Sequence, residues 1–331
     1  MPEHKAKDFL VGVDLGGTKI LAGVFTSKLE LIGQAKISTK SHRGVETVIE
    51  RIAHCVHEVL DECDLSLKQV KAVGVGAPGT VDTEKGVVIF APNLPAWKEV
   101  PLQKQLEKAL NLPVVVGNDC NLCTLGVHEV ELKGKPRQMV GMFVGTGIGG
   151  GLILNGQLYL GHNLTAGEVG HMVVNVDGPK CGCGNRGCLE AVASRTALFR
   201  KVQAALKAGQ KTVLTDFLGS DLKDMRSGDL RKAIRKGDKL VERIVLEAAG
   251  FLGVGVASLL NVVNPEVFVL GGGVIEALEG EMLPTIIKTA QQHVMGGALK
   301  GVEIRASRLG DNAGITGAAV IARSKSKGRA G

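Results

Sequence analysis

The sequence lacks any apolar run of the length that crosses a membrane. A membrane-spanning helix needs about 20 consecutive, mostly apolar residues, and by inspection no stretch of this 331-residue chain approaches that length. The first ten residues, MPEHKAKDFL, also lack the apolar core and the small-residue cleavage site of a secretory signal. These two absences argue against membrane and secreted proteins, and we expect a soluble protein of the cytoplasm.

The even set of spaced cysteines that marks a disulfide framework is missing too. The chain has seven cysteines, and Cys181, Cys183 and Cys188 lie close together in the sequence. An odd, clustered set fits a metal site in a reducing compartment better than it fits disulfide bonds. We therefore expect thiols or thiolates.

Aromatic residues are scarce, whereas glycine is abundant. Aromatic side chains make up 3% of the chain, and 46 residues are glycine, which is roughly twice the average share. Because no short-period repeat accounts for the glycines, they indicate loops in which the backbone approaches a ligand closely. An apolar share of 44% and a charged share of 22% are globular values, and the length allows two domains.

The formal net charge of +7 is compatible with an anionic partner. Lysine and arginine are spread widely, however, and gather mainly at 200–243 and in the C-terminal sequence SKSKGRAG. We interpret these clusters as a solvated helical face and a frayed terminus rather than as a nucleic-acid-binding surface. An anionic small substrate stays compatible with the charge.

Short apolar segments alternate with helical periodicity along the chain, which predicts an α/β fold. In the first half we expect strands at 9–14, 20–26, 31–38, 70–76 and 114–117, and helices at 45–63 and 101–110. In the second half we expect strands at 139–145, 152–154, 266–270 and 302–306, mostly helix up to 263, and helices near 275–295 and 312–323.

A glycine turn follows an early strand in each half, which suggests two similarly built domains. We expect a small domain formed by 1–117 with 311–331, and a large domain formed by 118–310. The cleft between two such domains is the natural place for a ligand.

Three glycine-rich turns are candidates for nucleotide contacts. The segment D-x-G-G-T-K, Asp14 to Lys19, can cradle a phosphate with its backbone N–H groups while the carboxylate holds Mg²⁺ through water, although an ordinary hairpin explains it equally well. The run G-T-G-I-G-G-G at 145–151 precedes a strand and lacks the G-K-[ST] of a Walker A loop, so we interpret it as a phosphate-holding hairpin. The glycines at 271–273 can lie under a base or ribose, or simply begin a helix that needs small residues.

Asn118 and Asp119 stand where a predicted strand meets a helix. Phosphoryl transfer to an alcohol needs one carboxylate that accepts the hydroxyl proton, and Asp119 fits that role. From the dipeptide alone, an N-cap role for Asp119 is the better explanation. Cys120 and Cys123 form a C-x-x-C motif, which we interpret as packed helical residues because no thioredoxin-like context surrounds them.

The strongest motif is H-x9-C-x-C-x4-C, formed by His171, Cys181, Cys183 and Cys188. One imidazole and three thiolates make a closed, tetrahedral zinc site, and the glycines between the thiols let the loop wrap the ion. A small buried thiol cluster is the less favoured alternative. Four protein ligands leave no position for an activated water, so the expected role of the zinc is structural.

Two carboxylates, Glu168 and Glu190, flank the expected zinc loop at 171–190. A fixed loop would hold them rigidly, which suits them to accept hydrogen bonds from sugar hydroxyls. A solvated surface position is the default explanation for either glutamate alone.

Together these motifs resemble the ROK family of sugar kinases, in particular its bacterial glucokinase type. The matching segments, in the order of the family, are Asp14–Lys19, Gly76–Gly79, Asn93–Trp97, Asn118–Asp119, Gly145–Gly151, Glu168–His171, Cys181–Glu190 and Asn264–Gly273. They span nearly the whole chain. The resemblance implies an actin-like (ribonuclease H-like) ATPase fold and an ATP-dependent hexose kinase that transfers the γ-phosphoryl group to the 6-hydroxyl of glucose.

The resemblance also implies roles for single residues. Asp119 is the catalytic base, Asp14 lies near Mg²⁺, Gly272 lies near the adenosine, and Lys19 lies by the phosphates without a firm role. The sugar contacts are Asn93, Asn118, Glu168, His171 and Glu190, and the phosphate contacts are Gly16, Gly17, Thr18, Thr146 and Gly147. One nitrogen of His171 then binds zinc and the other a sugar hydroxyl. The relatives are commonly dimers or tetramers, so we expect a homodimer with no nucleic-acid or membrane partner.

Other members of this family are the competing interpretations. Kinases of N-acetylglucosamine, N-acetylmannosamine, fructose, allose and mannose share much of the pattern, since the choice among similar sugars depends on one or two hydroxyl contacts. The segment N-L-P-A-W at 93–97 favours glucose by resemblance, and some relatives use polyphosphate. Only 13 residues precede Asp14, which leaves no room for the DNA-binding domain of a repressor. An intact base and glycine loop disfavour a non-catalytic sugar sensor.

Overall fold

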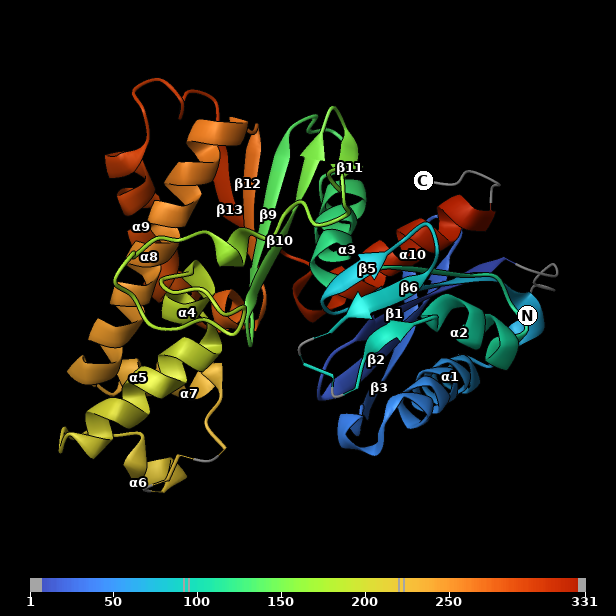
Figure 1. Ribbon diagram of the computed structural model, residues 1–331, viewed down its shortest axis with the longest axis horizontal. Helices are drawn as coiled ribbons and strands as arrows, with labels where there is room; N and C mark the ends of the chain where they lie inside the picture. Colours follow the sequence, from blue (N-terminus) through green and yellow to red (C-terminus); the bar gives the residue numbers. More distant parts are fainter. Residues whose placement is uncertain (1–7, 92, 95, 220, 223, 327–331) are drawn as a thin grey trace. The chain divides into compact units, whose positions relative to one another are not determined.

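The computed structural model describes residues 8–91, 93–94, 96–219, 221–222 and 224–326 (Figure 1). The chain forms two compact units. The first unit contains residues 1–135, 151–166 and 312–331, and the second contains 136–150 and 167–311.

The first unit is built on a five-stranded sheet with the order β3-β2-β1-β4-β8. Its strands are β1 (Phe9–Leu15), β2 (Lys19–Thr26), β3 (Leu31–Ser38), β4 (Val70–Ala77) and β8 (Val114–Asn118). The first three strands are antiparallel neighbours, whereas β1, β4 and β8 run parallel. The parallel strands therefore end at one edge of the sheet.

Helices cover both faces of this sheet. On one face, α1 (Val45–Glu62) and α2 (Leu102–Leu110) bury an apolar stripe against the strands. On the other face, α10 (Ala313–Ser326) packs on β1 and β4 (Figure 1). Glycines at this contact allow the strands and the helix to approach closely. A Cβ at Gly12 would overlap the backbone of Ile315, and a Cβ at Gly74 would overlap the backbone of Ala318.

This close contact yields a prediction about stability. Gly74→Ala forces a methyl group into the backbone of α10 and is expected to lower the free energy of unfolding by about 2–3 kcal/mol. Gly250→Ala is the matched control, since its Cβ meets nothing within 4 Å in the middle of a helix, and alanine there should stabilise by about 0.5–1 kcal/mol. Thermal and urea denaturation of both variants measure the difference, and equal stabilities would contradict the packing.

The domain boundaries differ from those expected from the sequence. The sequence places residues 118–135 with the second half, whereas the structure groups them, and residues 151–166, with the first unit. The reason is α3 (Asp119–Gly126), which packs directly on α10. A Cβ at Gly126 would lie 2.7 Å from the Gly317 nitrogen, and one at Gly317 would overlap the Leu122 carbonyl.

The second unit combines parallel strands with most of the remaining helices. The second sheet has the order β11-β10-β9-β12-β13, in which β9, β12 and β13 run parallel. Its strands are β9 (Met139–Val144), β10 (Ile148–Leu154), β11 (Gln157–Tyr159), β12 (Val267–Gly271) and β13 (Glu303–Ala306). Of these strands, β11 and most of β10 belong to residues 151–166, which are grouped with the first unit. The helices are α4 (Leu189–Ala193), α5 (Arg195–Lys207), α6 (Thr215–Leu218), α7 (Ser227–Arg235), α8 (Lys239–Val263) and α9 (Gly273–His293).

One helix corrects the expectation that no segment reaches the length of a membrane span. By length and composition, α8 is long and apolar enough to cross a bilayer. A helix that is apolar on most sides belongs either in a membrane or in a protein core, and 61% of the most apolar part of α8 is buried in the protein. We interpret α8 as a core helix, because it packs on α4, α5, α7 and α9.

The strands and helices predicted at the sequence level are otherwise present, with ends that differ by a few residues. The prediction missed a small sheet of β5 (Thr80–Asp82), β6 (Val87–Phe90) and β7 (Lys98–Val100). These strands are too short to give a clear alternating pattern. Their last connection carries Asn93–Trp97, of which Pro95 lies outside the described residues.

Candidate functional site

The parallel strands of the first unit bring predicted site residues to one edge of the sheet. Asp14 of β1 pairs in register with Gly76 of β4, and Ala77 pairs with Asn118 of β8. Ligands of α/β sheets bind outside the carboxyl ends of parallel strands, and this edge is such an end. The half-buried Asp14 faces the start of α10, where a Cβ at Gly314 would lie 3.1 Å from the carboxyl carbon.

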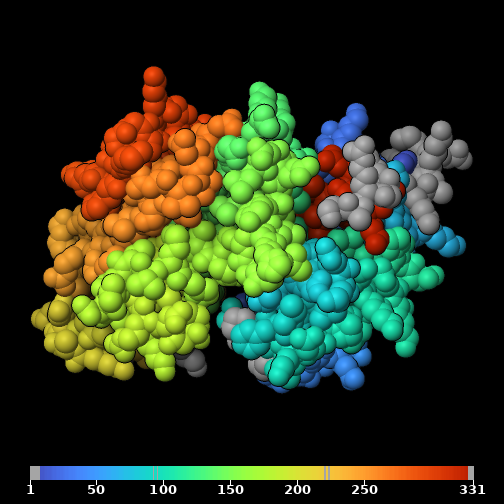
Figure 2. Space-filling model, turned by 45° about the horizontal axis from the view of Figure 1, so that its top comes forward, coloured from blue at the N-terminus to red at the C-terminus, as the bar shows by residue number. Residues whose placement is uncertain are grey.

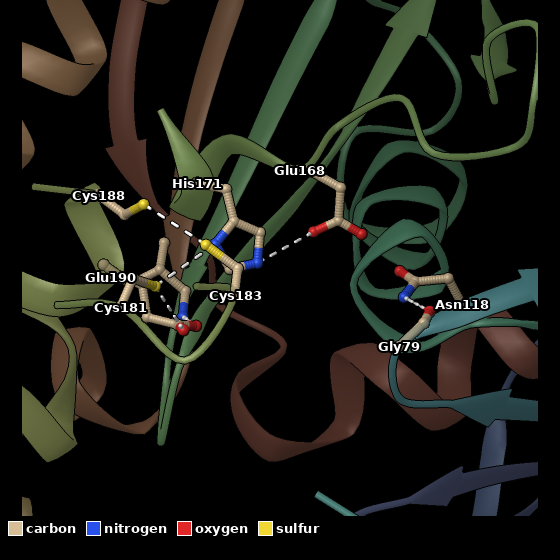
Figure 3. A network of polar contacts seen from close by, with 9 residues as sticks. Gly79, Asn118, Glu168, His171, Cys181, Cys183, Cys188 and Glu190 are labelled. Carbon is tan, nitrogen blue, oxygen red and sulfur yellow. Dashed lines mark hydrogen bonds and ion pairs between the residues drawn. The ribbon is translucent and has the colours of Figure 1, made fainter. Parts of the chain in front are cut away.

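Asn118, not Asp119, is the N-cap of α3. The Asn118 Oδ1 accepts a hydrogen bond of 2.9 Å from the Asn121 amide, and its Nδ2 donates one of 2.9 Å to the Gly79 carbonyl (Figure 3). Asp119 follows in the first turn, half-buried, with its Oδ1 2.8 Å from the Cys120 amide. The N-cap explanation of Asp119 is therefore wrong, and its carboxylate is oriented by a backbone N–H instead. Cys120 and Cys123 lie one turn apart in α3, as expected.

The first glycine turn is a tight connection between β1 and β2. The Gly16 amide donates to the Lys19 carbonyl at 2.9 Å. Buried Thr39 stabilises the turn with two hydrogen bonds. Its hydroxyl donates to the Gly16 carbonyl at 2.7 Å, and its amide donates to the Thr18 carbonyl at 2.9 Å. Thr18 is exposed and Lys19 is half-buried. No sequence signal pointed to Thr39, which follows the third strand without a motif around it.

Exposed Asn93 lies beside this turn. A Cβ at Gly17 would be 3.0 Å from the Asn93 carbonyl oxygen and 3.4 Å from its Cβ. Glycine at position 17 thus permits the approach of the loop between β6 and β7. The structure brings together a predicted phosphate-binding residue and a predicted sugar-binding residue within the first unit.

In the second unit, Glu190 connects the second glycine turn to the cysteine cluster. The Ile148 amide donates to the Glu190 Oε2 at 2.9 Å, and a Cβ at Gly147 would overlap the same carboxylate. The other oxygen, Oε1, lies 3.8 Å from the Cys181 Sγ. Glu190 therefore has a structural task besides its predicted sugar contact.

Two residues that the sequence analysis missed also hold this turn. The Arg195 guanidinium donates to the Thr146 hydroxyl, and the Thr196 hydroxyl donates to the Thr146 carbonyl at 2.8 Å. Both stand at the start of α5, about 50 residues away in sequence, so no local pattern links them to Thr146.

The four predicted metal ligands form a compact cluster (Figure 3). All four donor atoms lie within 4.8 Å of one another. The Cys181 Sγ is 3.8 Å from the His171 Nδ1, and the Cys183 Sγ is 3.7 Å from the Cys188 Sγ. A tetrahedral ion with Zn–S bonds of about 2.3 Å and a Zn–N bond of about 2.0 Å separates its ligand atoms by roughly 3.5–3.8 Å. The donor set therefore fits zinc.

The loop that carries the cysteines depends on glycine. Gly187 has a φ of 73°, and a Cβ there would overlap the Asn175 carbonyl. The Cys181 amide donates to the Asn185 carbonyl at 2.8 Å, which closes the turn that contains Cys183. Residues 182–186 are exposed, and they belong to the yellow-green part of the chain, which lies at the surface in Figure 2.

The pKa values of the three thiols are shifted in different directions. Burial raises the pKa of Cys188 to about 12 and also raises the pKa of Cys181, whereas the backbone N–H of Asn185 lowers the pKa of Cys183. Three adjacent thiolates repel one another, and a divalent ion at their centre removes that cost.

The imidazole of His171 faces two ways. Its Nδ1 points to the thiols, and its Nε2 lies 3.9 Å from the Glu168 Oε2 (Figure 3). Burial raises the pKa of Glu168, the Glu190 carboxylate raises it further, and His171 opposes the shift. The Glu168 side chain is 46% exposed, so its carboxylate is accessible to a ligand.

Gly272 lies between β12 and α9 and needs to be glycine for structural reasons. Its φ is 85°, and a Cβ there would lie 2.6 Å from the Val144 carbonyl oxygen. This geometry supports the explanation that the glycines begin a helix. The contact between Gly272 and adenosine stays a prediction.

Comparisons with known proteins identify the family to which the chain belongs. Residues 10–325 match the ROK family. The chain is 36% identical to a glucokinase of Thermotoga maritima over 326 residues, which are 98% of this chain and 99% of the relative.

Two solved structures are also similar. One is a ROK family glucokinase from Streptomyces griseus in complex with glucose and AMPPNP, with a TM-score of 0.85, 33% identity and coverage of 96% of this chain and 99% of that one. The other is a ROK hexokinase from Thermus thermophilus, with a TM-score of 0.76, 34% identity and coverage of 97% and 99%. The α/β units thus form the actin-like ATPase fold expected from the sequence, and the chain belongs to the ROK family.

Proposed function

We propose that this protein is a glucokinase, which transfers the γ-phosphoryl group of ATP to the 6-hydroxyl of glucose. The observation that carries the proposal is the placement of Asp119 in the first turn of α3, directly after the capping Asn118 and at the carboxyl edge that also holds Asp14. Similarity to glucokinases over nearly the whole chain supports the choice of sugar.

The reaction asks little covalent chemistry of the protein. Asp119 accepts the proton of the attacking hydroxyl, while the two glycine turns offer backbone N–H groups to the donor phosphates. These turns supply Gly16, Gly17, Thr18, Thr146 and Gly147. Asp14 would hold the Mg²⁺ that arrives with ATP, Lys19 lies next to the first turn, and Gly272 is the predicted adenosine contact.

The sugar is held by Asn93, Asn118, Glu168, His171 and Glu190. His171, Cys181, Cys183 and Cys188 would hold a zinc ion, which would supply structure and no chemistry, because four protein ligands fill a tetrahedral site. The Nδ1 of His171 belongs to the metal, and its Nε2, beside Glu168, is available to a sugar hydroxyl. A reduced cysteine cluster suits the cytoplasm, and a homodimer is the expected assembly.

The experiment that tests this proposal is a coupled kinase assay of the purified protein with Mg-ATP. The acceptors are glucose, mannose, N-acetylglucosamine, N-acetylmannosamine, fructose and allose, and the series is repeated with polyphosphate in place of ATP. Selective turnover of glucose is expected. Selective turnover of another sugar would replace the substrate and keep the mechanism, and the absence of turnover with every pair would contradict a kinase and favour a sugar sensor.

A further inference from the structure

A basic cavity of about 480 Å³ opens beside the second glycine turn of the second unit. Its lining includes Thr146, Arg195, Phe199, Arg200, Asp224 and Arg226. Three guanidinium groups against one carboxylate give these residues a formal net charge of +2. A cavity of this composition attracts a polyanion.

Arg195 joins this cavity to the turn. Ser194 caps α5 through the Ala197 amide, which places Arg195 in the first helical position. From there the Arg195 amide donates to the Gly145 carbonyl at 2.9 Å, and its guanidinium donates to the Thr146 hydroxyl. One residue thus fixes both the backbone and the side chain of the turn.

A guanidinium is suited to a second task at this point. It carries five N–H donors in a rigid, planar fork, so the bond to Thr146 leaves other donors for an anionic oxygen. Arginine and phosphate form charge-assisted, often bidentate hydrogen bonds that are stronger than neutral ones. Because Thr146 and Arg195 both line the cavity, a phosphate chain that contacts Thr146 comes within reach of the fork.

We propose that Arg195 is a donor-positioning residue, and that the basic cavity receives phosphate groups of the donor next to the transferred one. This inference rests on the proposed kinase function. The ligand chemistry is a phosphoanhydride chain, which ATP and inorganic polyphosphate share. Arg195 orders the turn that holds the chain and adds a cation beside it, while Arg200 and Arg226 set the positive field of the cavity.

Three substitutions of Arg195 separate these tasks from mere structural support. Arg195→Gln removes the charge, Arg195→Lys keeps the charge without the fork, and Arg195→Ala leaves space for added guanidinium ion. Arg243→Gln is the matched control, because Arg243 is exposed and bonds Gln210 beyond the opposite end of α5. Zinc content and thermal denaturation report whether each variant is folded.

Steady-state kinetics with Mg-ATP and glucose give the first readout. For Arg195→Gln we expect a KM for Mg-ATP raised roughly 10- to 100-fold, which is the loss of a hydrogen bond to a charged group, with the KM for glucose nearly unchanged. Arg195→Lys should be intermediate, guanidinium should partly restore Arg195→Ala, and Arg243→Gln should match the wild type. An unchanged KM for Mg-ATP, or equal increases for donor and sugar, would overturn the proposal.

A second variant keeps the test valid if changes at Arg195 prevent folding. Arg226→Gln leaves the bonds to Thr146 intact and removes one cation from the cavity, so it too should raise the KM for the donor selectively. If neither variant changes it, the cavity does not bind the donor. The same series with polyphosphate shows which source of the phosphate chain depends on these cations.

Failure of the proposed function gives a different pattern. If the wild type phosphorylates no sugar, calorimetric titration with Mg-ATP and with polyphosphate still compares wild type, Arg195→Gln and Arg226→Gln. Weaker binding by the variants would support the phosphate site without a kinase, and equal binding or none would reject it.

Discussion

Asp119→Asn is expected to reduce kcat about 10³-fold while leaving the affinity for glucose largely unchanged. An amide has nearly the shape of a carboxylate and can still accept the hydrogen bond from the Cys120 amide through its Oδ1. It cannot accept the proton of the attacking hydroxyl. Positioned general bases contribute about 10²–10⁴-fold to the rate, which sets the size of the expected loss.

Two measurements distinguish loss of the base from loss of the site. Coupled assays give kcat, and glucose binding follows from calorimetry or from the fluorescence of Trp97, the single tryptophan of the chain, which is buried in the segment that carries Asn93. Asp61→Asn, an exposed change on α1, is the matched control and should leave both values unchanged. Near-normal turnover of Asp119→Asn would exclude Asp119 as the base.

The parts of the site that could be predicted from the sequence are those whose chemistry is local. The predicted metal ligands follow each other closely in the sequence, so the spacing of Cys181, Cys183 and Cys188 already predicted a metal site, and the structure gathers their sulfur atoms with His171 as expected. The glycine turns were visible for the same reason. Gly16 and Gly17 connect two neighbouring strands, so the turn could be predicted from adjacent residues, and its phosphate contact stays a prediction.

Other parts depend on contacts between distant segments, which leave no pattern in a single sequence. The membership of α3 in the first unit follows from Gly126 and Gly317, which permit two helices almost 190 residues apart to touch. The same is true of three contacts with the glycine turns, which also join residues that are distant in the sequence. They are made by Thr39, Arg195 and Glu190. The cap lies at Asn118 instead of Asp119. This difference of one residue is smaller than the uncertainty with which the start of a helix can be predicted from sequence.

The link through Glu190 changes what the predicted zinc site is expected to do. Glu190 lies between the Cys181 thiol and the Ile148 amide, and His171 lies between the same thiol and Glu168. The metal cluster therefore contacts, through one residue in each case, both a predicted phosphate turn and a predicted sugar carboxylate. Loss of the metal should accordingly affect substrate binding as well as stability.

Cys183→Ser tests this coupling with the least disturbance of packing. Cys183 is exposed, so the change leaves no buried cavity and acts mainly through the loss of one thiolate ligand. We expect the variant to lose its zinc, to melt at a lower temperature, and to show a KM for glucose raised roughly 10- to 100-fold, as found when residues that orient a site around a metal are lost.

Metal analysis of the purified protein and kinetics on the same samples decide the outcome. Cys63→Ser is the matched control, because Cys63 lies at the end of α1 and outside the cluster, and it should keep one zinc per chain and normal kinetics. Stoichiometric zinc in Cys183→Ser would contradict the ligand set. Loss of zinc with an unchanged KM for glucose would keep the ligands and contradict the coupling, since His171 and Glu168 would then hold their positions without the ion.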